Sequence, residues 1–450
     1  MFKKILIANR GEIACRIIRA CKELGINTVA IYSDVDKESM HVKLADQSVC
    51  IGPANVLNSY LNIPSIIAAS EVTGADAIHP GYGFLAENTY FAEVCEACKL
   101  KFIGPSKNVI KQMGDKIAAI KLMKKFGIPV IPGSDGPVNS EDSKALYIAD
   151  KIGYPVIIKA SSGGGGKGMR VVYSKDTLKH SINTAQIEAK NAFGNPEVYI
   201  EKFIEEPHHI EFQILGDKYG KVAYLPERDC SVQRRHQKLI EESPSTLLTE
   251  TLRKKIGKIA QHAASIIKYV TVGTVEFIVD KKGHFYFMEM NTRIQVEHPV
   301  TEMLTGIDLV KEQIKLAAGD KLYINSDKIK TFGHVIECRI NAEDPSKDFI
   351  PSPGQIKKLF LPGGPGIRID TNIYTGYTIP AFYDSLIIKL IAHGQTRYEA
   401  IIRMKRALEE LHIEGIKNTS SILKDIIINE RFNKGNVNTN FLNEHIFGKY

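Results

Sequence analysis

The chain lacks the features that mark membrane-spanning and disulfide-stabilised proteins. No apolar run in its 450 residues approaches the roughly 20 residues that a bilayer-spanning helix needs, so we expect no membrane partner. It has only seven cysteines, an odd and widely scattered set. The one close pair, Cys95 and Cys98, lies in an amphipathic helical pattern without a second pair, which favours buried thiols over a zinc site. Such cysteine usage is typical of a reducing compartment, and we expect a cytoplasmic location.

Long blocks of basic residues are also absent. The net charge is +8, from 59 basic and 51 acidic residues, and the densest basic cluster is RRHQK at residues 234–238. A nucleic-acid-binding protein usually concentrates such an excess on one face or one tail. We therefore expect no nucleic-acid partner, and favour a site for an anionic small molecule.

Two common glycine-rich phosphate motifs are missing. The first predicted turn, residues 9–12, lacks the GxGxxG pattern of dinucleotide-binding folds. The glycine run at 163–166 is followed by Lys167 and Gly168, whereas a P-loop requires serine or threonine after the lysine and then a helix. Here the run lies between two strand-like segments, VIIKA and MRVVY. Because two glycines suffice for a tight turn, we interpret the excess as a hairpin flap whose N–H groups cover phosphate.

Strand-like and helix-like segments alternate along residues 1–103, which predicts a doubly wound parallel sheet. Residues 104–130 are typical of a connector, with a basic helix between glycine and proline turns. Residues 131–203 form a compact segment around the glycine run, and residues 204–450 are richer in strands. The fold class is therefore α/β, with more than one domain.

A pair of strands is predicted from GTVEFIVDKKGHFYFMEMN, residues 273–291. If Asp280 pairs with Gly283 across the turn, Glu276 lies opposite Phe287. The side chains at 285, 287, 289 and 291 then share the face of Glu276, because strand side chains alternate. A three-residue bulged turn would break this register.

On that face, Glu276, Glu289 and Asn291 are expected to converge. Two carboxylates and an amide oxygen are the hard ligands that Mg²⁺ prefers. A solvated polar face is the alternative, but FYFMEMN is too apolar for an exposed strand, and a buried carboxylate needs a cation. We therefore predict a metal site at these three residues.

Several longer motifs resemble those of the ATP-grasp biotin carboxylases. They occur in one order from residue 2 to the 440s: ILIANRGEIACRIIRA, IHPGYGFLAEN, FIGPS, MGDK, ERDCSVQRRHQK, EMNTRIQVEHPVTE and ECRINAEDP. The resemblance implies an ATP-grasp fold preceded by a Rossmann-like N-terminal domain and followed by a mixed β/α C-terminal domain. It also implies that residues 131–203 are a mobile lid over ATP. Ser162 and Thr271 stand where relatives often have glycine, but neither touches a charged motif residue.

The resemblance implies an ATP-dependent ligase that phosphorylates bicarbonate to carboxyphosphate and passes CO₂ to N1 of biotin. A pair of Mg²⁺ ions, replaceable by Mn²⁺, would accompany ATP. No AMKM-like biotin attachment motif occurs, so the biotin is expected on a separate biotin carboxyl carrier protein. The further expected partners are carboxyltransferase subunits and a second copy of the chain, as a homodimer.

The chain resembles the free-standing subunit of acetyl-CoA carboxylase, which would place it in fatty-acid synthesis. The same site residues permit a subunit of a pyruvate or propionyl-CoA carboxylase. Another ATP-grasp ligase, or a regulatory nucleotide-binding scaffold without catalysis, is a more distant alternative.

The resemblance also implies a role for each matching residue. Glu297 matches the general base, a carboxylate that must lie within hydrogen-bond reach of bicarbonate. Arg293, Lys238 and the backbone of Val296 match the bicarbonate pocket, since an arginine fork suits a planar oxyanion. Arg339 matches the cation that stabilises the biotin enolate.

The nucleotide contacts expected from the resemblance form a larger set. They are Lys116, Lys159, Gly164, Gly165, Gly166, Glu201, Lys202, Ile204, His209, Gln233, His236, Glu276, Glu289 and Val296. Adenine is expected at backbone groups of the hinge around Glu201 and Lys202. The neighbouring histidine, His208, leaves the assignment of His209 open.

Overall fold

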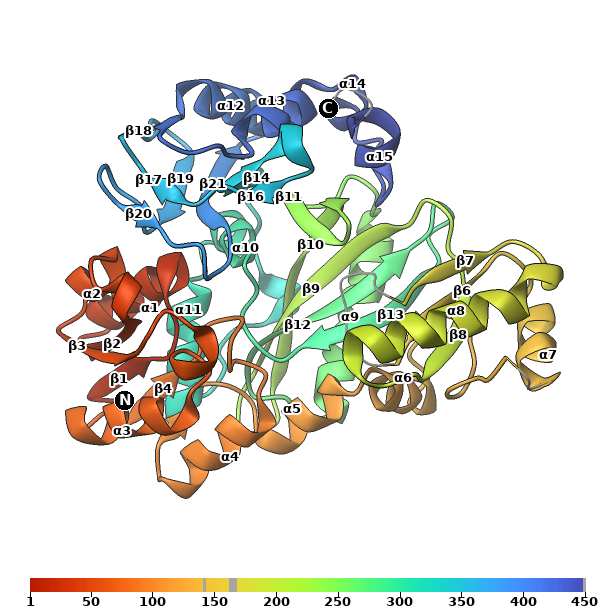
Figure 1. Cartoon of the computed structure of the whole chain (residues 1–450), viewed down its shortest axis with the longest axis horizontal. Helices are drawn as coiled ribbons and strands as arrows, with labels where there is room; N and C mark the ends of the chain where they lie inside the picture. Colours follow the sequence, from red (N-terminus) through yellow and green to blue (C-terminus); the bar gives the residue numbers. More distant parts are fainter. Residues whose placement is uncertain (141–142, 162–167, 448–450) are drawn as a thin grey trace.

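The computed structural model describes residues 1–140, 143–161 and 168–447. Within these residues the chain builds a parallel N-terminal sheet, a small antiparallel sheet and one large antiparallel sheet that continues into the C-terminal part. In Figure 1 the N-terminal sheet lies at the lower left, the small sheet at the right and the C-terminal helices at the top. The predicted glycines Gly164, Gly165 and Gly166 lie outside the described residues.

The N-terminal sheet has the order β3-β2-β1-β4-β5, and all its pairings are parallel. Its strands are β1 (Lys4–Ile7), β2 (Asn27–Ser33), β3 (Gln47–Gly52), β4 (Ala77–His79) and β5 (Lys101–Phe102). Its helices are α1 (Gly11–Glu23), α2 (Met40–Leu44), α3 (Ile63–Thr73) and α4 (Thr89–Ala97). The doubly wound parallel sheet is thus confirmed, because central strands buried on both faces read as short apolar runs.

Two helices, not one, follow this sheet. They are α5 (Lys107–Gly114) and α6 (Lys116–Lys125). Asp115 separates them, and its Oδ1 accepts a hydrogen bond from the N–H of Ala118 at 3.0 Å. An N-terminal cap of this kind starts a new helix and turns the chain there, which brings Lys116 to the beginning of α6.

The small sheet has the order β7-β6-β8 and carries its own hydrophobic core. Its elements are α7 (Ser143–Ile152), β6 (Val156–Ala160), β7 (Arg170–Val172), α8 (Lys175–Phe193) and β8 (Val198–Lys202). β6 and β7 pair antiparallel, with Val156 opposite Val172. The two segments that flank the glycine run therefore form the two strands of a hairpin.

The large sheet has the order β13-β12-β9-β10-β11-β14-β21-β19. Its strands are β9 (His208–Gly216), β10 (Val222–Arg234), β11 (Gln237–Ser243), β12 (Thr271–Val279), β13 (Phe285–Asn291), β14 (His334–Asn341), β19 (Ile367–Thr371) and β21 (Leu386–Gly394). The pairing of β11 with β14 places Glu241 opposite Glu337. This pairing joins the central strands to the C-terminal strands in one continuous surface.

Helices and short strand pairs complete the central and C-terminal parts. The helices are α9 (Glu250–Ile266), α10 (His298–Thr305), α11 (Leu309–Ala318), α12 (Arg397–Glu410), α13 (Ser420–Ile428), α14 (Glu430–Asn433) and α15 (Phe441–His445). The short strands are β15 (Glu343–Asp344), β16 (Ile350–Pro351), β17 (Gly354–Gln355), β18 (Lys358–Phe360), β20 (Thr378–Ile379) and β22 (His412–Glu414).

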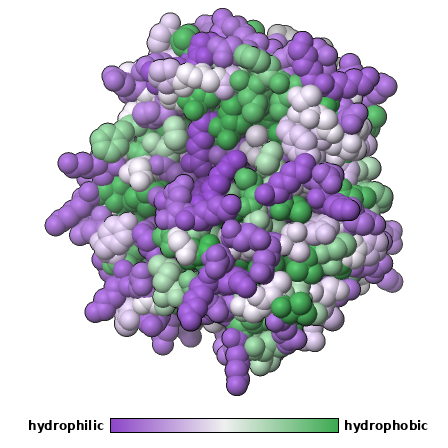
Figure 2. Space-filling model, turned by 90° about the vertical axis from the view of Figure 1, so that its left-hand side faces the viewer, coloured by the Kyte–Doolittle hydropathy of each residue, from purple (hydrophilic) through white to green (hydrophobic). Residues whose placement is uncertain are grey.

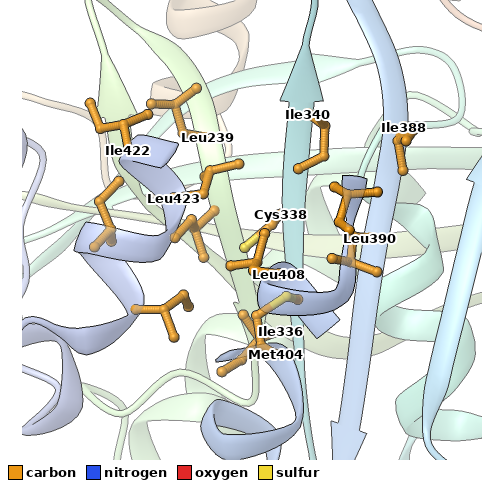
Figure 3. Close-up of a cluster of buried hydrophobic side chains, with 14 of the residues drawn as sticks. Leu239, Ile336, Cys338, Ile340, Ile388, Leu390, Met404, Leu408, Ile422 and Leu423 are labelled. Atoms are coloured by element: carbon orange, nitrogen blue, oxygen red, sulfur yellow. The ribbon is translucent and has the colours of Figure 1, made fainter. Parts of the chain in front are cut away.

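Strands β14 and β21 bury both faces, but with different contents. Figure 3 shows one face, where apolar side chains of both strands pack against α12 and α13. Those labelled are Leu239, Ile336, Cys338, Ile340, Ile388, Leu390, Met404, Leu408, Ile422 and Leu423. The opposite face packs on α10 through Val300, Leu304, Val335 and Ile391. That face also carries Arg339, and this is the alternation that the sequence predicts for residues 336–341.

All seven cysteines are free thiols, but they do not share one environment. Cys95 is buried whereas Cys98 is exposed, so the expectation of two buried thiols is wrong for Cys98, which lies just past the end of α4. No helix among the described residues is long and apolar enough to cross a membrane. Hydrophilic and hydrophobic side chains are interspersed over the face shown in Figure 2, as on an ordinary water-exposed surface.

Candidate active site

A cavity of about 870 Å³ lies where the N-terminal sheet, the small sheet and the large sheet meet. This volume lies in the range of sites that bind small molecules and cofactors. The cavity is lined by every described residue that the sequence nominated. These are Lys116, Lys159, Glu201, Lys202, Ile204, His209, Gln233, His236, Lys238, Glu276, Glu289, Asn291, Arg293, Val296, Glu297 and Arg339.

The hairpin of β12 and β13 has a different register from the one predicted. Asp280 pairs with His284, not with Gly283, through a three-residue turn in which Gly283 has a φ of +81°. This turn places Phe287 opposite Phe277 rather than opposite Glu276. The prediction that Glu276 faces Phe287 is therefore wrong.

A bulge at Met288 then restores the predicted face. Beyond the bulge Glu276 lies directly opposite Glu289, and Asn291 lies opposite Thr274 on the same face as Glu276. The Nδ2 of Asn291 donates to Oε1 of Glu276 at 2.7 Å. The three nominated oxygen-bearing side chains thus share one face of one hairpin.

Glu276 is buried and fully satisfied by polar neighbours. Its Oε2 lies 2.6 Å from Nε2 of His209, and its Oε1 accepts from Lys238 at 3.3 Å and from Gln295 at 2.8 Å. Burial alone would raise the pKa of Glu276, but Lys238 and His209 outweigh it and lower the pKa far below its usual range. The carboxylate is therefore negatively charged at neutral pH.

The donor set fits a divalent cation. Glu289 is partly exposed to the cavity and pairs with Lys116 at 3.1 Å, while Oδ1 of Asn291 accepts from Arg293 at 3.0 Å. Two carboxylates and one amide oxygen, all open to the same cavity, are the ligands that Mg²⁺ prefers. The ammonium groups of Lys116 and Lys238 neutralise the same carboxylates that would bind the metal.

The strand pair of the small sheet brings a lysine and a carboxylate to the cavity. Nζ of Lys159, near the end of β6, pairs with Oε2 of Glu201 on β8 at 2.6 Å. The backbone N–H of Lys202 donates to the carbonyl of Pro132 at 2.7 Å, and its Nζ donates to the carbonyls of Gly153 and Tyr154. The N–H of Lys202 thus has a hydrogen-bond partner within the protein.

The geometry distinguishes the two neighbouring histidines. Successive residues of a strand point to opposite faces. His209 lines the cavity. His208 points to the opposite face of the sheet, where its Nδ1 lies 3.9 Å from the carboxylate of Asp229 on β10. Of the pair, His209 is the one that faces the cavity.

Arg293 is held in place by side chains on three sides. Its Nε pairs with Glu87 at 3.0 Å, its Nη1 donates to Oε1 of Gln295 at 2.9 Å, and its Nη2 donates to Asn291. Glu87 belongs to the N-terminal domain, so this arginine bridges that domain and the β12–β13 hairpin. These bonds fix its planar fork at the cavity wall.

Glu297 lies between two cations that come from different strands. Lys238 on β11 donates to its Oε1 at 2.7 Å, and Nη2 of Arg339 on β14 donates to its Oε2 at 2.8 Å. Burial would raise the pKa of Glu297, but Lys238 and then Arg339 overcome this effect and hold the pKa well below its usual range. Glu297 is therefore a buried, ionised carboxylate.

Further carboxylates complete this network, and the sequence analysis did not nominate them. Lys238 pairs with Glu211 at 2.6 Å, and Nε of Arg339 donates to Glu241 at 2.6 Å. Glu211 also pairs with Arg228 at 2.6 Å. The available signal was a charged residue in a strand otherwise rich in apolar residues, as in HIEFQILG for Glu211. The partners themselves come from distant strands and leave no local pattern.

Glu241 and Glu337 form a buried pair of carboxyl groups. They lie directly opposite each other on β11 and β14, and neither oxygen of Glu337 has a hydrogen-bond partner among the described residues. Burial and the charge of Glu241 raise the pKa of Glu337 well above its usual value, although Lys389 and Arg339 oppose this shift. Burial raises the pKa of Glu241 to about 7, with Arg339 opposing and Glu297 reinforcing the shift. Burial and the neighbouring carboxylate of Glu241 therefore favour the protonated form of Glu337.

Models of three protein families match consecutive parts of the chain. Biotin carboxylase, N-terminal domain, matches residues 1–110, and biotin carboxylase C-terminal domain matches residues 337–444. Between them, carbamoyl-phosphate synthase L chain, ATP binding domain, matches residues 115–325. The fold and the cavity between the two antiparallel sheets thus define an ATP-grasp protein.

Individual relatives match over almost the whole chain. The biotin carboxylase of Haemophilus influenzae is 56% identical over 446 residues, 99% of each chain. A pyruvate carboxylase subunit of Methanothermobacter thermautotrophicus is 55% identical over 445 residues, 99% of this chain and 90% of that protein. A solved structure also matches: the biotin carboxylase domain dimer of the 2-oxoglutarate carboxylase of Hydrogenobacter thermophilus, in complex with MgADP, ADP and bicarbonate. The two structures superpose with a TM-score of 0.93 at 52% sequence identity. The match covers 99% of this chain and 98% of that chain. The chain belongs to the biotin carboxylase family.

Replacing Glu337 by glutamine should make stability less sensitive to alkaline pH. In the wild type the folded state keeps a proton that the unfolded state releases above its ordinary pKa, so stability falls as pH rises toward the raised folded pKa. Glutamine carries no such proton. Urea unfolding should show Glu337→Gln gaining on the wild type by up to about 1.4 kcal/mol per pH unit between about pH 5 and 8.

The exposed Glu71→Gln on α3 controls for the change of residue type. If the stability of Glu337→Gln relative to the wild type falls as the pH rises from about 5 to 8, the pKa of Glu337 in the folded state is not raised.

Proposed function

We propose that this protein carboxylates biotin with ATP and bicarbonate, through carboxyphosphate. One observation carries the proposal: the ionised Glu297 lies between Lys238 and Arg339, in the same cavity as the carboxylates of Glu276 and Glu289. A base, an anion clamp and a metal-binding face thus border one space. Membership of the biotin carboxylase family supports the same reaction.

In the first half of this reaction Glu297 acts as the general base. Bicarbonate would lie against Arg293 and Lys238, and its proton would pass to the carboxylate of Glu297 as its oxygen attacks the γ-phosphorus of ATP. ADP leaves as carboxyphosphate forms. Lys116 and Lys159 both line the cavity and would contact the transferred phosphate.

Glu276, Glu289 and Asn291 would hold Mg²⁺, or Mn²⁺ in its place. The metal, when bound, neutralises the charge of the phosphate oxygens. Adenine would lie at the hinge around Glu201 and Lys202, beside Ile204. We also propose that residues 131–203 close over the nucleotide, because this segment has a sheet and a core of its own.

In the second half of the reaction Arg339 acts on biotin. Its guanidinium, which reaches the cavity wall, would stabilise the negative charge that develops on the ureido oxygen when N1 loses its proton. Carboxyphosphate would break into CO₂ and phosphate, the phosphate would accept the proton of N1 and leave as hydrogen phosphate, and N1 would attack the CO₂.

The assembly around this chain is a separate proposal. We propose a homodimer, in line with the domain dimer of the Hydrogenobacter relative, and biotin presented by a separate carrier protein. We propose acetyl-CoA as the final acceptor, through carboxyltransferase subunits, as the resemblance to a free-standing subunit implies. Pyruvate is the second candidate, because the Methanothermobacter relative is a pyruvate carboxylase subunit.

The purified protein should hydrolyse ATP only when bicarbonate is present, and free biotin should be carboxylated. Glu297→Gln keeps the size of the side chain but cannot accept the proton, so bicarbonate-dependent ADP release should fall by about 10² to 10⁴. Nucleotide binding by calorimetry should persist. Glu250→Gln, at a surface glutamate of α9 that pairs with Arg253, is the control. Full turnover by Glu297→Gln would contradict the assignment of the base.

Arg339→Ala should separate the two halves of the reaction. Loss of a preorganised cation costs roughly 3 kcal/mol of transition-state stabilisation, so biotin carboxylation should fall by at least about 10². Bicarbonate-dependent ATP hydrolysis should fall less, because Lys238 still pairs with Glu297. Arg234→Ala removes a cation that pairs with the exposed Asp348 and serves as the control. An equal loss of both activities would contradict the role in biotin activation.

A further inference from the structure

A completely buried lysine lies next to residues Val296 and Glu297, which we call the catalytic segment. Lys389 lies in the middle of β21, in the apolar sequence LIIKLIA, and its side chain is 0% exposed. A buried lysine is costly unless its charge is compensated and its donors are used. Its neighbours therefore show what this position does.

The ammonium group of Lys389 contacts three groups from three parts of the chain. It donates to the backbone carbonyl of Val296 at 2.9 Å and pairs with Oε2 of Glu12 on α1 at 3.1 Å. Asp370 on β19 lies 3.9 Å away. The carboxylates compensate the charge, while the bond to Val296 fixes one peptide group of the catalytic segment.

The register of the large sheet explains why the lysine reaches this segment. Lys389 lies directly opposite Arg339, so the two side chains project from the same face of neighbouring strands. Arg339 binds the carboxylate of Glu297, and Lys389 binds the carbonyl of the residue before it. Two cations side by side thus hold the two ends of one short segment.

The N–H of His298 donates to the carbonyl of Gln295 at 3.3 Å, and the N–H of Val300 donates to the carbonyl of Glu297 at 3.2 Å, whereas Lys389 is the donor to the carbonyl of Val296. Glu297 precedes the first residue of α10 and makes no side-chain cap to that helix. The peptide plane between Val296 and Glu297 sets the direction of the Glu297 side chain and of the backbone that borders the cavity. A hydrogen bond from a charged donor to the carbonyl of that peptide restricts its rotation.

The contact with Glu12 extends the link to the cavity surface. The other carboxylate oxygen of Glu12 accepts a hydrogen bond from the hydroxyl of Tyr82, and both residues line the cavity. The N-terminal domain is thereby tied to the same lysine. The sequence analysis nominated none of these three residues.

We propose that Lys389 is a positioning residue that orients the Val296–Glu297 peptide for bicarbonate binding and proton transfer. The inference rests on the proposed function, because the experiment that tests it measures the KM for bicarbonate. The competing account is that Lys389 only balances the charge of Glu12. A matched pair of double variants separates the two accounts.

Both double variants carry Glu12→Gln, so neither leaves a buried charge without its partner. Lys389→Met with Glu12→Gln removes the donor to Val296, whereas Lys389→Gln with Glu12→Gln keeps a neutral donor of similar size. Charged donors contribute more than neutral ones to a hydrogen bond. We expect the methionine variant to raise the KM for bicarbonate by about tenfold or more, with the KM for ATP within about twofold of wild type. The glutamine variant should recover part of the loss.

Arg253→Met is the control for loss of a buried ion pair away from the site. Arg253 on α9 pairs with the buried Glu227 at 2.9 Å. This variant should be destabilised while its KM for bicarbonate stays at the wild-type value. The proposal is overturned if the methionine double variant has a wild-type KM for bicarbonate, or if the KM values for ATP and bicarbonate rise together. A wild type without bicarbonate-dependent ATP hydrolysis would instead refute the proposed function.

A direct measurement tests the peptide itself. The sequence contains only the Val-Glu pairs Val275–Glu276 and Val296–Glu297, so ¹³C-carbonyl valine with ¹⁵N-glutamate isolates these amide signals in NMR spectra. In the single Lys389→Gln variant the Val296–Glu297 signal should shift or broaden, and the Val275–Glu276 signal should stay in place. A Val296–Glu297 signal unchanged in position and width would also overturn the proposal.

Discussion

The site depends on an ionised carboxylate held in the interior by cations from two neighbouring strands. Glu297 is 0% exposed, and an unpaired charge there would be prohibitively unstable. Lys238 and Arg339 make it possible, and both are fixed in turn by the carboxylates of Glu211 and Glu241. Because β11 pairs with β14, this network joins the central and C-terminal parts of the large sheet. The proposed active site and the continuity of the large sheet thus depend on the same strand pairing.

The same network explains how a base of depressed pKa can serve the proposed reaction. Without an anion, Lys238 donates to Glu297 and keeps it ionised. At the proposed site bicarbonate would compete for the charge of Lys238, and the pKa of Glu297 would rise toward the range in which a carboxylate accepts a proton well. Base strength would then be coupled to occupancy of the bicarbonate pocket. Water alone would not provide this coupling, because it brings no negative charge to the lysine.

The sequence predicted features that depend on neighbouring residues, and it missed contacts between residues that are far apart in the chain. The alternation of strand-like and helix-like segments was enough to predict the parallel N-terminal sheet. The alternation of apolar and polar residues along 336–341 was enough to predict which face of the strand carries Arg339. The β12–β13 register was wrong, yet the site still converged. The three-residue turn moved Phe287 to the face of Phe277, and the bulge at Met288 returned Glu289 and Asn291 to the face of Glu276. Neither irregularity has a clear local signal. Lys389 was missed because its partners come from three distant segments.

The most direct test is the ionisation state of Glu297 itself. In protein labelled with ¹³C at the glutamate δ-carbon, the signal absent from Glu297→Gln identifies this residue. The account predicts that its chemical shift stays at the ionised value between about pH 5 and 8 in the ligand-free protein. It also predicts that bicarbonate with a non-hydrolysable ATP analogue moves the apparent pKa upward. A ligand-free Glu297 that titrates within this range, or one unaffected by bicarbonate, would contradict the central claim.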